Sequence, residues 1–146
     1  MKIFDELVKD HETQRTIADQ ILETQGDSTE RKQLWVNLKK ELTAHEESEE
    51  RHFYIPLMQV DKSQEQARHS VAEHNEMDEL VDKLDETDMS TSAWLIYFRD
   101  LHEKINHHLD EEEEDVFDLA KKVLNDQEIE RLGREYRQMM QEKKKS

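Results

Sequence analysis

Apolar residues recur along this chain at spacings of three and four, the period of a helix that buries one face. Four long helices are predicted: about Phe4–Thr24, about Thr29–Leu57, from near Ser63 to the turn Glu86-Thr87-Asp88, and about Ser92–Leu119. A short fifth helix follows Asn125. The expected fold class is all-α, an up-down-up-down four-helix bundle with a short fifth C-terminal helix. One domain over residues 1–146 is expected, with the bundle at about 3–122 and the extra helix at about 126–143.

Each predicted helix presents one inward stripe of residues at helical spacing. In the first two helices the stripes are Leu7, His11, Gln14, Ala18, Ile21 and then Trp35, Leu38, Leu42, His45, Glu49. In the next two they are Ala67, Val71, His74, Asp78, Val81 and then Trp94, Phe98, Leu101, Ile105, His108, Glu112, Val116, Leu119. The fifth helix carries Ile129, Leu132 and Tyr136 on one face and is expected to pack on the outside of the bundle.

Helix ends are predicted from local signals. Asp27 and Glu30 are spaced as a capping pair at the start of the second helix, and Ser63 with Gln66 as one at the start of the third. Pro56 is expected to bend or end the second helix, because proline lacks the backbone N–H that a helix interior needs.

The composition narrows the functional classes. The net charge of −16 leaves no basic face for nucleic acid, and the chain has no cysteine for disulfides, thiolate metal sites or thiol catalysis. We therefore expect no nucleic-acid partner. No stretch is apolar enough to span a membrane, so we also expect no membrane partner and a cytoplasmic location. The oligomeric state is left open.

The two halves of the chain repeat at an offset of 63 residues. His11 corresponds to His74, His45 to His108, and Glu49 to Glu112, and the apolar stripe repeats with them. Each half is therefore a helical hairpin with one lone His on its first helix and a His-x-x-x-Glu on its second. Two such hairpins would bring four His and two Glu to one level of the bundle.

A metal site explains this pattern better than hydrogen-bonded core residues do. A single His on an apolar stripe is more often a hydrogen-bonded core residue than a ligand. Buried carboxylates are different, because they cost several kcal/mol unless a cation or hydrogen bonds neutralise them. The expected ligands are His11, His45, Glu49, His74, His108 and Glu112. Imidazole and carboxylate without sulfur suit iron, manganese or zinc, and six ligands for two metals favour a functional pair of irons.

Asp78 departs from the repeat near the predicted metals, because its counterpart in the first half is Arg15. We consider it either as a seventh metal ligand, as an acceptor that orients a ligating His, or as the partner of Arg15 in a salt bridge. His52, His69, His102 and His107 fall off the stripe or beyond the metal level, and they are interpreted as surface or rim residues.

These residues resemble the hemerythrin-like, HHE cation-binding family over about the first 120 residues. The matching motifs are Asp10-His11-Glu12, His45-Glu46-Glu47-Ser48-Glu49-Glu50 leading to Phe53-Tyr54-Ile55-Pro56, Glu73-His74, and His108-Leu109-Asp110-Glu111-Glu112-Glu113 leading to Val116-Phe117. The resemblance implies two iron ions bridged by oxo or hydroxo and by Glu49 and Glu112. The chain departs from oxygen-carrying hemerythrins at Asp78, where they have a second His, and at Glu112, where their fourth-helix motif is His-x-x-x-x-Asp.

Three functions are compared. The first is a di-iron protein that binds oxygen, nitric oxide or another small ligand, or that senses or handles iron in a stress response. The second is a di-iron enzyme of the peroxidase, iron oxidase or nitric oxide reductase type, which a redox-active tyrosine near the metals would favour. Tyr54 is the nearest candidate, although its position favours end-of-bundle core. The third is a structural zinc or manganese protein.

Overall fold

The structure, a computed structural model, describes residues 1–145; Ser146, the last residue of the predicted domain, lies outside them. Helices and turns make up these residues and no strand occurs among them, so the predicted all-α class is confirmed. None of the described helices is long and apolar enough to cross a membrane.

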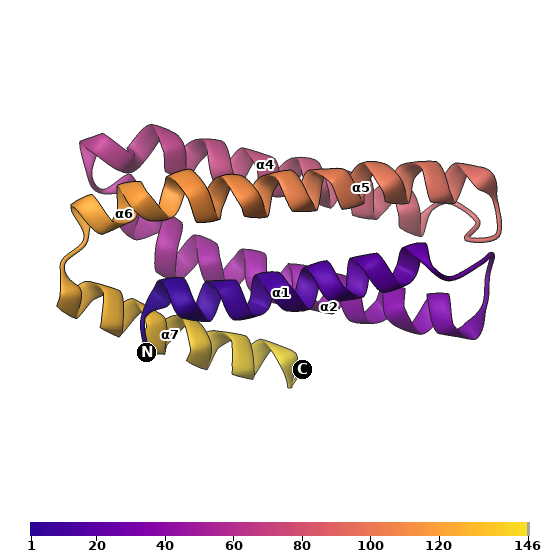
Figure 1. The fold of residues 1–146 in the computed structure, drawn as a ribbon, viewed down its shortest axis with the longest axis horizontal. Coiled ribbons are helices and arrows are strands. Elements are labelled where there is room, and N and C mark those ends of the chain that lie inside the picture. Colours follow the sequence, from indigo (N-terminus) through magenta and orange to yellow (C-terminus); the bar gives the residue numbers. More distant parts are fainter. Residues whose placement is uncertain (146) are drawn as a thin grey trace.

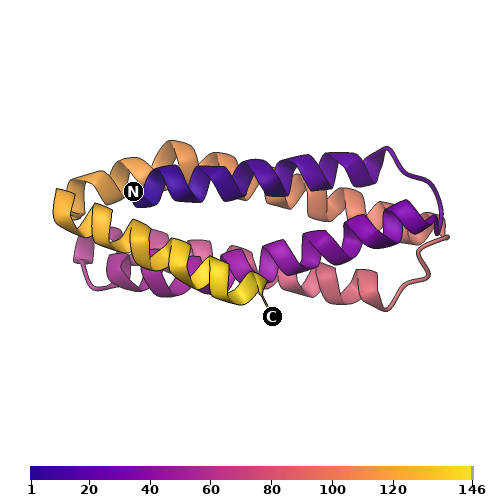
Figure 2. The same ribbon diagram turned by 90° about the horizontal axis from the view of Figure 1, so that it is seen from below.

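Two helical hairpins lie against each other (Figures 1 and 2). The first is formed by α1 (Ile3–Leu22) and α2 (Thr29–Glu49), and the second by α4 (Asp61–Asp85) and α5 (Ser92–Glu111). Both hairpin turns lie at the same end of the molecule. At the other end α2 continues through the π-helical η1 (Glu50–Tyr54) into α3 (Ile55–Met58), and α5 through the π-helical η2 (Glu112–Val116) into α6 (Phe117–Val123). The last helix, α7 (Asp126–Lys144), packs on α1 and α2.

Hydroxyl caps begin the second helix of each hairpin. The Ser28 side chain accepts a hydrogen bond from the Arg31 backbone N–H, and Thr91 accepts one from Trp94. The two caps are 63 residues apart, so they follow the repeat. The predicted cap at Asp27 is therefore wrong by one residue, because the neighbouring serine satisfies the free N–H instead.

The third helix starts near Ser63 as predicted, but the predicted cap there is wrong. Helix α4 begins at Asp61, after Val60 in an extended conformation. The Ser63 hydroxyl lies inside the first turn and donates to the Leu57 carbonyl at 2.6 Å. Ser63 thus ties the new helix to the end of the preceding one rather than capping it with Gln66.

Pro56 does not end the helical path. It lies in the first turn of α3, where its missing N–H costs little. The irregularity is the π-helical turn before it, and η2 has the same geometry without a proline. A π-helical turn also shifts the phase of the buried face, so Ala120 is buried and the predicted Leu119 only half-buried.

The inward stripes predicted for the first two helices and for the fifth are buried as expected. The apolar residues of these stripes belong to two separate clusters. One, near the hairpin turns, is built around Trp35, Trp94 and Phe98, with Trp94 stacked on Phe98 at a centroid distance of 5.3 Å. The other lies at the opposite end, around Phe53 and Phe117. A layer of buried polar side chains separates the two.

Gly133 lets α7 lie against the first residues of the chain. A Cβ at this position would lie 2.8 Å from the Ile3 nitrogen and 2.9 Å from the Lys2 carbonyl carbon, and closer still to the Met1 carbonyl oxygen. Alanine normally stabilises a helix interior by up to about 1 kcal/mol relative to glycine. Here we expect Gly133→Ala to lower the free energy of unfolding by about 1–3 kcal/mol, because backbone atoms must move.

Urea unfolding measures this effect. Arg134→Ala is the control, since Arg134 is exposed on the next position of the same helix. A free energy of unfolding equal to or above that of the wild type in Gly133→Ala would contradict the close approach.

Candidate metal centre

Six buried side chains meet between the two apolar clusters, and they come from five helical segments. They are 0–3% exposed and comprise His11 on α1, His45 and Glu49 on α2, His74 on α4, His108 on α5 and Glu112 at the start of η2. The six residues singled out by the repeat are thus brought together in space.

The inner atoms of these side chains lie at the distances of donors around cations. His11 Nε2 is 3.1 Å from Glu112 Oε1, and Glu49 Oε1 is 3.3 Å from His45 Nε2 and 3.2 Å from His74 Nε2. The atoms form two groups, each within 4.8 Å: His11, His45, Glu49 and Glu112, and then Glu49, His74 and His108. Glu49 belongs to both groups, which is the position of a bridging carboxylate.

Several of these atoms have no hydrogen-bond partner. Among residues 1–145, His11 Nε2, His45 Nε2, both carboxylate oxygens of Glu49 and Glu112 Oε1 are buried and make no hydrogen bond. Buried polar atoms are normally satisfied, because an unsatisfied one costs about 1–3 kcal/mol. A set of nitrogen and oxygen donors that face one another fits a cation site, so these residues suit a pair of metal ions.

The outer nitrogens of the imidazoles are all engaged. In three cases the Nδ1–H donates directly to a carboxylate: His11 to Glu113 at 2.6 Å, His74 to Glu50 at 2.9 Å, and His108 to Glu73 at 2.9 Å. These bonds turn the Nε2 atoms of the three imidazoles toward the centre, as the outer partners of ligating histidines do.

The outer carboxylates were not predicted, although the sequence carries a signal for them. Glu50 and Glu113 are 63 residues apart, and each directly follows a glutamate of the inner set. Asp10 and Glu73 are also 63 residues apart, and each directly precedes the lone His of its hairpin. The repeat therefore extends to the side chains that orient the ligands.

The fourth imidazole is held differently. His45 Nδ1 is 2.6 Å from the Tyr136 hydroxyl, which donates to Asp10 Oδ2 at 2.5 Å. Arg137 donates to both Asp10 and Glu6. Helix α7 thus contributes a buried hydroxyl to the site, where the other hairpin uses Glu73 alone. Nothing in the repeat could have indicated this role, because α7 has no counterpart in the first half.

Tyr54 also differs from its counterpart in the repeat. Its hydroxyl donates to Glu112 Oε2 and lies 3.5 Å from His108 Nε2. The interpretation of Tyr54 as end-of-bundle core is confirmed for its ring, but its hydroxyl also lies among the inner donors. Its counterpart Phe117 has no hydroxyl. Burial and the Glu112 carboxyl raise the pKa of Tyr54 well above its usual value, so the phenol is protonated.

The structure corrects the placement of Asp78. Its side chain is exposed and hydrogen-bonds to Glu46 rather than to the six inner residues, and Met77 occupies the buried position instead. Burial, followed by that contact with Asp78, raises the pKa of Glu46 to about 9. Arg15 pairs with Glu12, Asp110 and Glu113, so the predicted salt bridge is absent as well.

The charges of the inner residues balance only when protons or cations are present. Burial lowers the pKa of His11, but the carboxylates of Glu112 and Glu113 outweigh it and raise it to about 9. Burial and the charge of Glu49 raise the pKa of Glu112. Because an imidazole must be neutral to bind a metal, cation binding here releases protons, and falling pH opposes it.

The remaining histidines lie away from the centre, as predicted. His52 contacts Glu135, His102 contacts Asp19, and His69 and His107 are 54% and 69% exposed at the side chain.

The fold is a helical bundle with a buried layer of histidines and glutamates that could hold metal ions. The family model of the hemerythrin HHE cation-binding domain matches residues 2–120, and the chain belongs to this family. A crystal structure of a hemerythrin HHE cation-binding domain-containing protein from Mycobacterium kansasii has the same fold: the TM-score is 0.89 at 24% identity, over 98% of this chain and 87% of that one. No curated protein matches the sequence.

The Tyr136 hydroxyl can be tested as a support of His45. We expect Tyr136→Phe to weaken metal binding by about 10–100-fold, because the His45 imidazole loses the acceptor that orients it. Competition against a chelator measures the affinity. Tyr97→Phe removes a hydroxyl from a half-buried ring outside the site and should leave the affinity unchanged. Equal affinities in the wild type and Tyr136→Phe would contradict the role.

Proposed function

We propose that this chain is a non-haem di-iron protein of the hemerythrin-like type. Its two hairpins form an up-down-up-down four-helix bundle with a short fifth helix, and the bundle holds two irons. The ligands are His11, His45, Glu49, His74, His108 and Glu112, with Glu49 and Glu112 as bridging carboxylates. Asp78 is left out of this set because its side chain is exposed.

The observation that carries the proposal is the set of buried donors without partners around Glu49. A buried ionised carboxylate costs several kcal/mol unless it is paired. Here both oxygens of Glu49 are buried without a hydrogen bond, and imidazole nitrogens from four helices surround the side chain. Two divalent or trivalent cations would satisfy all of these atoms together.

Iron is favoured by the chemistry of the donors. Imidazole and carboxylate without sulfur suit iron, manganese or zinc, and six protein ligands shared by two metals leave positions for a small molecule. Such irons, held by these residues, would supply a redox-active centre that could take up oxygen, nitric oxide or another small ligand. Iron sensing or handling in a stress response would use the same ligands.

The protein's own part is to hold and shield the centre. Carboxylates on three of the Nδ1 atoms and the Tyr136 hydroxyl on that of His45 fix the imidazoles, and the apolar clusters on both sides exclude bulk water. Low dielectric strengthens the interactions between the ligands and any bound charge.

A di-iron enzyme is the second candidate, and Tyr54 favours it. A protonated phenol whose hydroxyl lies on Glu112 and near His108 can give up a proton, or a proton and an electron, to a small molecule bound at the centre. A peroxidase or oxidase needs such a donor, whereas reversible binding of a ligand does not.

Metal analysis and an optical spectrum of the aerobically purified protein test the di-iron proposal. We expect two irons per chain and visible absorption from bridged iron. His45→Ala should lose much of the metal and lower the free energy of unfolding by about 3–5 kcal/mol, because buried carboxylates are left unpaired. His102→Ala is the control, since His102 lies at the surface. One zinc per chain without colour, or full iron and stability in His45→Ala, would refute the proposal.

Peroxide separates the binder from the enzyme. If the protein is an enzyme, hydrogen peroxide is consumed over many turnovers, and Tyr54→Phe slows this by about 10²-fold or more at unchanged metal content. Phenylalanine keeps the ring that packs beside Phe53. Tyr97→Phe serves again as the control. Consumption of no more than one equivalent per centre would exclude the peroxidase and support the binding function.

A further inference from the structure

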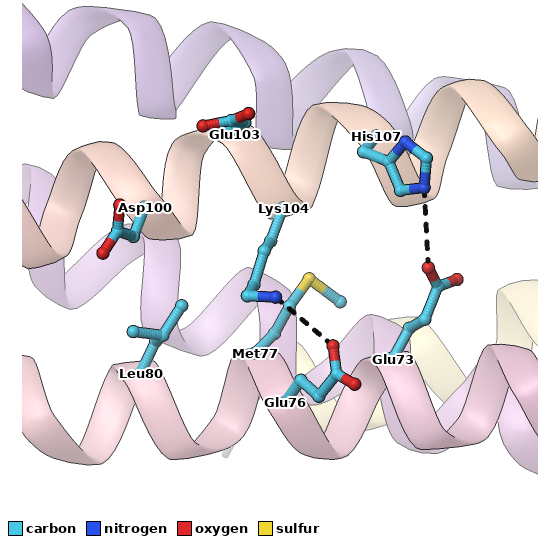
Figure 3. A pocket seen from close by; sticks show the side chains of 8 residues that line it. All are labelled: Glu73, Glu76, Met77, Leu80, Asp100, Glu103, Lys104 and His107. Carbon is cyan, nitrogen blue, oxygen red and sulfur yellow. Dashed lines mark hydrogen bonds and ion pairs between the residues drawn. The ribbon is translucent and has the colours of Figure 1, made fainter.

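A second group of metal-ligating side chains lies outside the buried centre, where α4 and α5 run side by side. It consists of His69 and Glu73 on α4 and His107 and Glu111 on α5. Each helix supplies a His and a Glu four positions apart, so both side chains of a pair lie on the same face, one turn from each other. Figure 3 shows His107 and Glu73 facing each other across the groove between the two helices.

His69, Glu73 and Glu111 each offer one ligand atom within 4.8 Å of the others, and His107 lies at ion-pair distance from both carboxylates. His69 Nε2 lies 3.3 Å from Glu111 Oε1 and 3.6 Å from Glu73 Oε2, and His107 Nε2 lies 3.2 Å from Glu111 Oε2 and 3.9 Å from Glu73 Oε2. Two ligands each about 2.1 Å from a tetrahedral metal are about 3.4 Å apart. The imidazole–carboxylate spacings lie around that value.

The four side chains differ in solvent exposure in a way that suits an exchangeable ion. Glu73 and Glu111 are only 15% and 21% exposed, and Gln66 donates to Glu111 at 3.2 Å. The two imidazoles are exposed and can turn toward a cation from solvent. The carboxylates thus provide the fixed part of the site, and the histidines complete it.

The surroundings attract cations. The groove beside His107 is lined by Glu73, Glu76, Asp100 and Glu103, and its Lys104 is already paired with Glu76 at 3.3 Å (Figure 3). The chain as a whole carries a net charge of −16. Such a field raises the local concentration of cations.

Glu73 connects this group to the buried centre. Its Oε2 faces the two surface histidines, and its Oε1 accepts the Nδ1–H of His108 at 2.9 Å. A cation on Oε2 would draw electron density from the carboxylate and weaken its hydrogen bond to His108.

We propose that His69, Glu73, His107 and Glu111 form an exchangeable surface site for a divalent transition-metal cation, linked to the buried centre through the two oxygens of Glu73. The mixed donors favour ions such as Zn²⁺, Fe²⁺ or Mn²⁺ over Mg²⁺ or Ca²⁺, which prefer oxygen alone. The surface site goes beyond the proposed function and does not depend on it. The link to His108 rests on metal being present at the buried centre.

Calorimetric titration of the purified protein with Zn²⁺ tests the site, with its buried metals in place and excess Mg²⁺ to occupy sites made of carboxylates alone. We expect one Zn²⁺ per chain to bind, and at least tenfold more weakly in the double variant His69→Ala/His107→Ala. The matched control is His52→Ala/His102→Ala, which also removes two imidazoles from ion pairs with carboxylates. Equal isotherms in the wild type and the first variant, or an equal loss in the control, would overturn the site and leave four surface residues in ion pairs only.

Metal content and the optical spectrum, recorded before and after titration, separate this proposal from the di-iron one. The buried metals should stay in place in both double variants. Zn²⁺ should shift the absorption of the buried centre in the wild type but not in His69→Ala/His107→Ala; an unshifted wild-type spectrum would overturn the link through Glu73. A colourless protein without iron that still binds Zn²⁺ through His69 and His107 would refute the di-iron proposal and uphold the surface site.

Discussion

The burial of two carboxylates in a narrow helical bundle is the constraint on which the rest of this structure depends. Glu49 and Glu112 lie at one level with almost no contact with water, and neighbouring carboxylates repel each other. Only positive charge can make that arrangement favourable, and the four imidazoles offer it either as protons or as ligands for cations. The same layer splits the apolar core into two clusters, so the hydrophobic packing on each side holds the ligands at their spacing.

The π-helical turns belong to the same constraint. One begins directly after Glu49 and the other at Glu112, although only the first is followed by a proline. π-Helical turns inside α-helices are frequent at functional sites, where they redirect side chains. Here they allow a glutamate to face the centre while Phe53 and Val116, a few residues later, still return to the core.

The repeat was sufficient to predict the hairpins and to bring six inner residues together, because a 63-residue offset records the spacing that both hairpins share. The repeat did not predict which of two neighbouring residues is buried or caps a helix, or how α7 packs on the bundle. Steps of three and of four from His74 reach Met77 and Asp78, and the pattern alone could not tell which is buried. The cap at Ser28 was missed by one residue because Asp27 and Ser28 both carry suitable oxygens. Tyr136 was expected on a packed face, but its hydrogen bond to His45 depends on how α7 docks, which no local pattern records.

The departures from two-fold symmetry distinguish the two halves of the centre. His11, His74 and His108 donate directly to carboxylates, whereas His45 reaches Asp10 through the Tyr136 hydroxyl. A neutral hydroxyl is a weaker hydrogen-bond acceptor than a carboxylate, so the His45 imidazole is the least polarised of the four. Tyr54 places a further hydroxyl on the opposite side, against Glu112. The symmetric residues therefore supply the inner donors of the proposed metal centre, while the two tyrosines make its two halves chemically unequal.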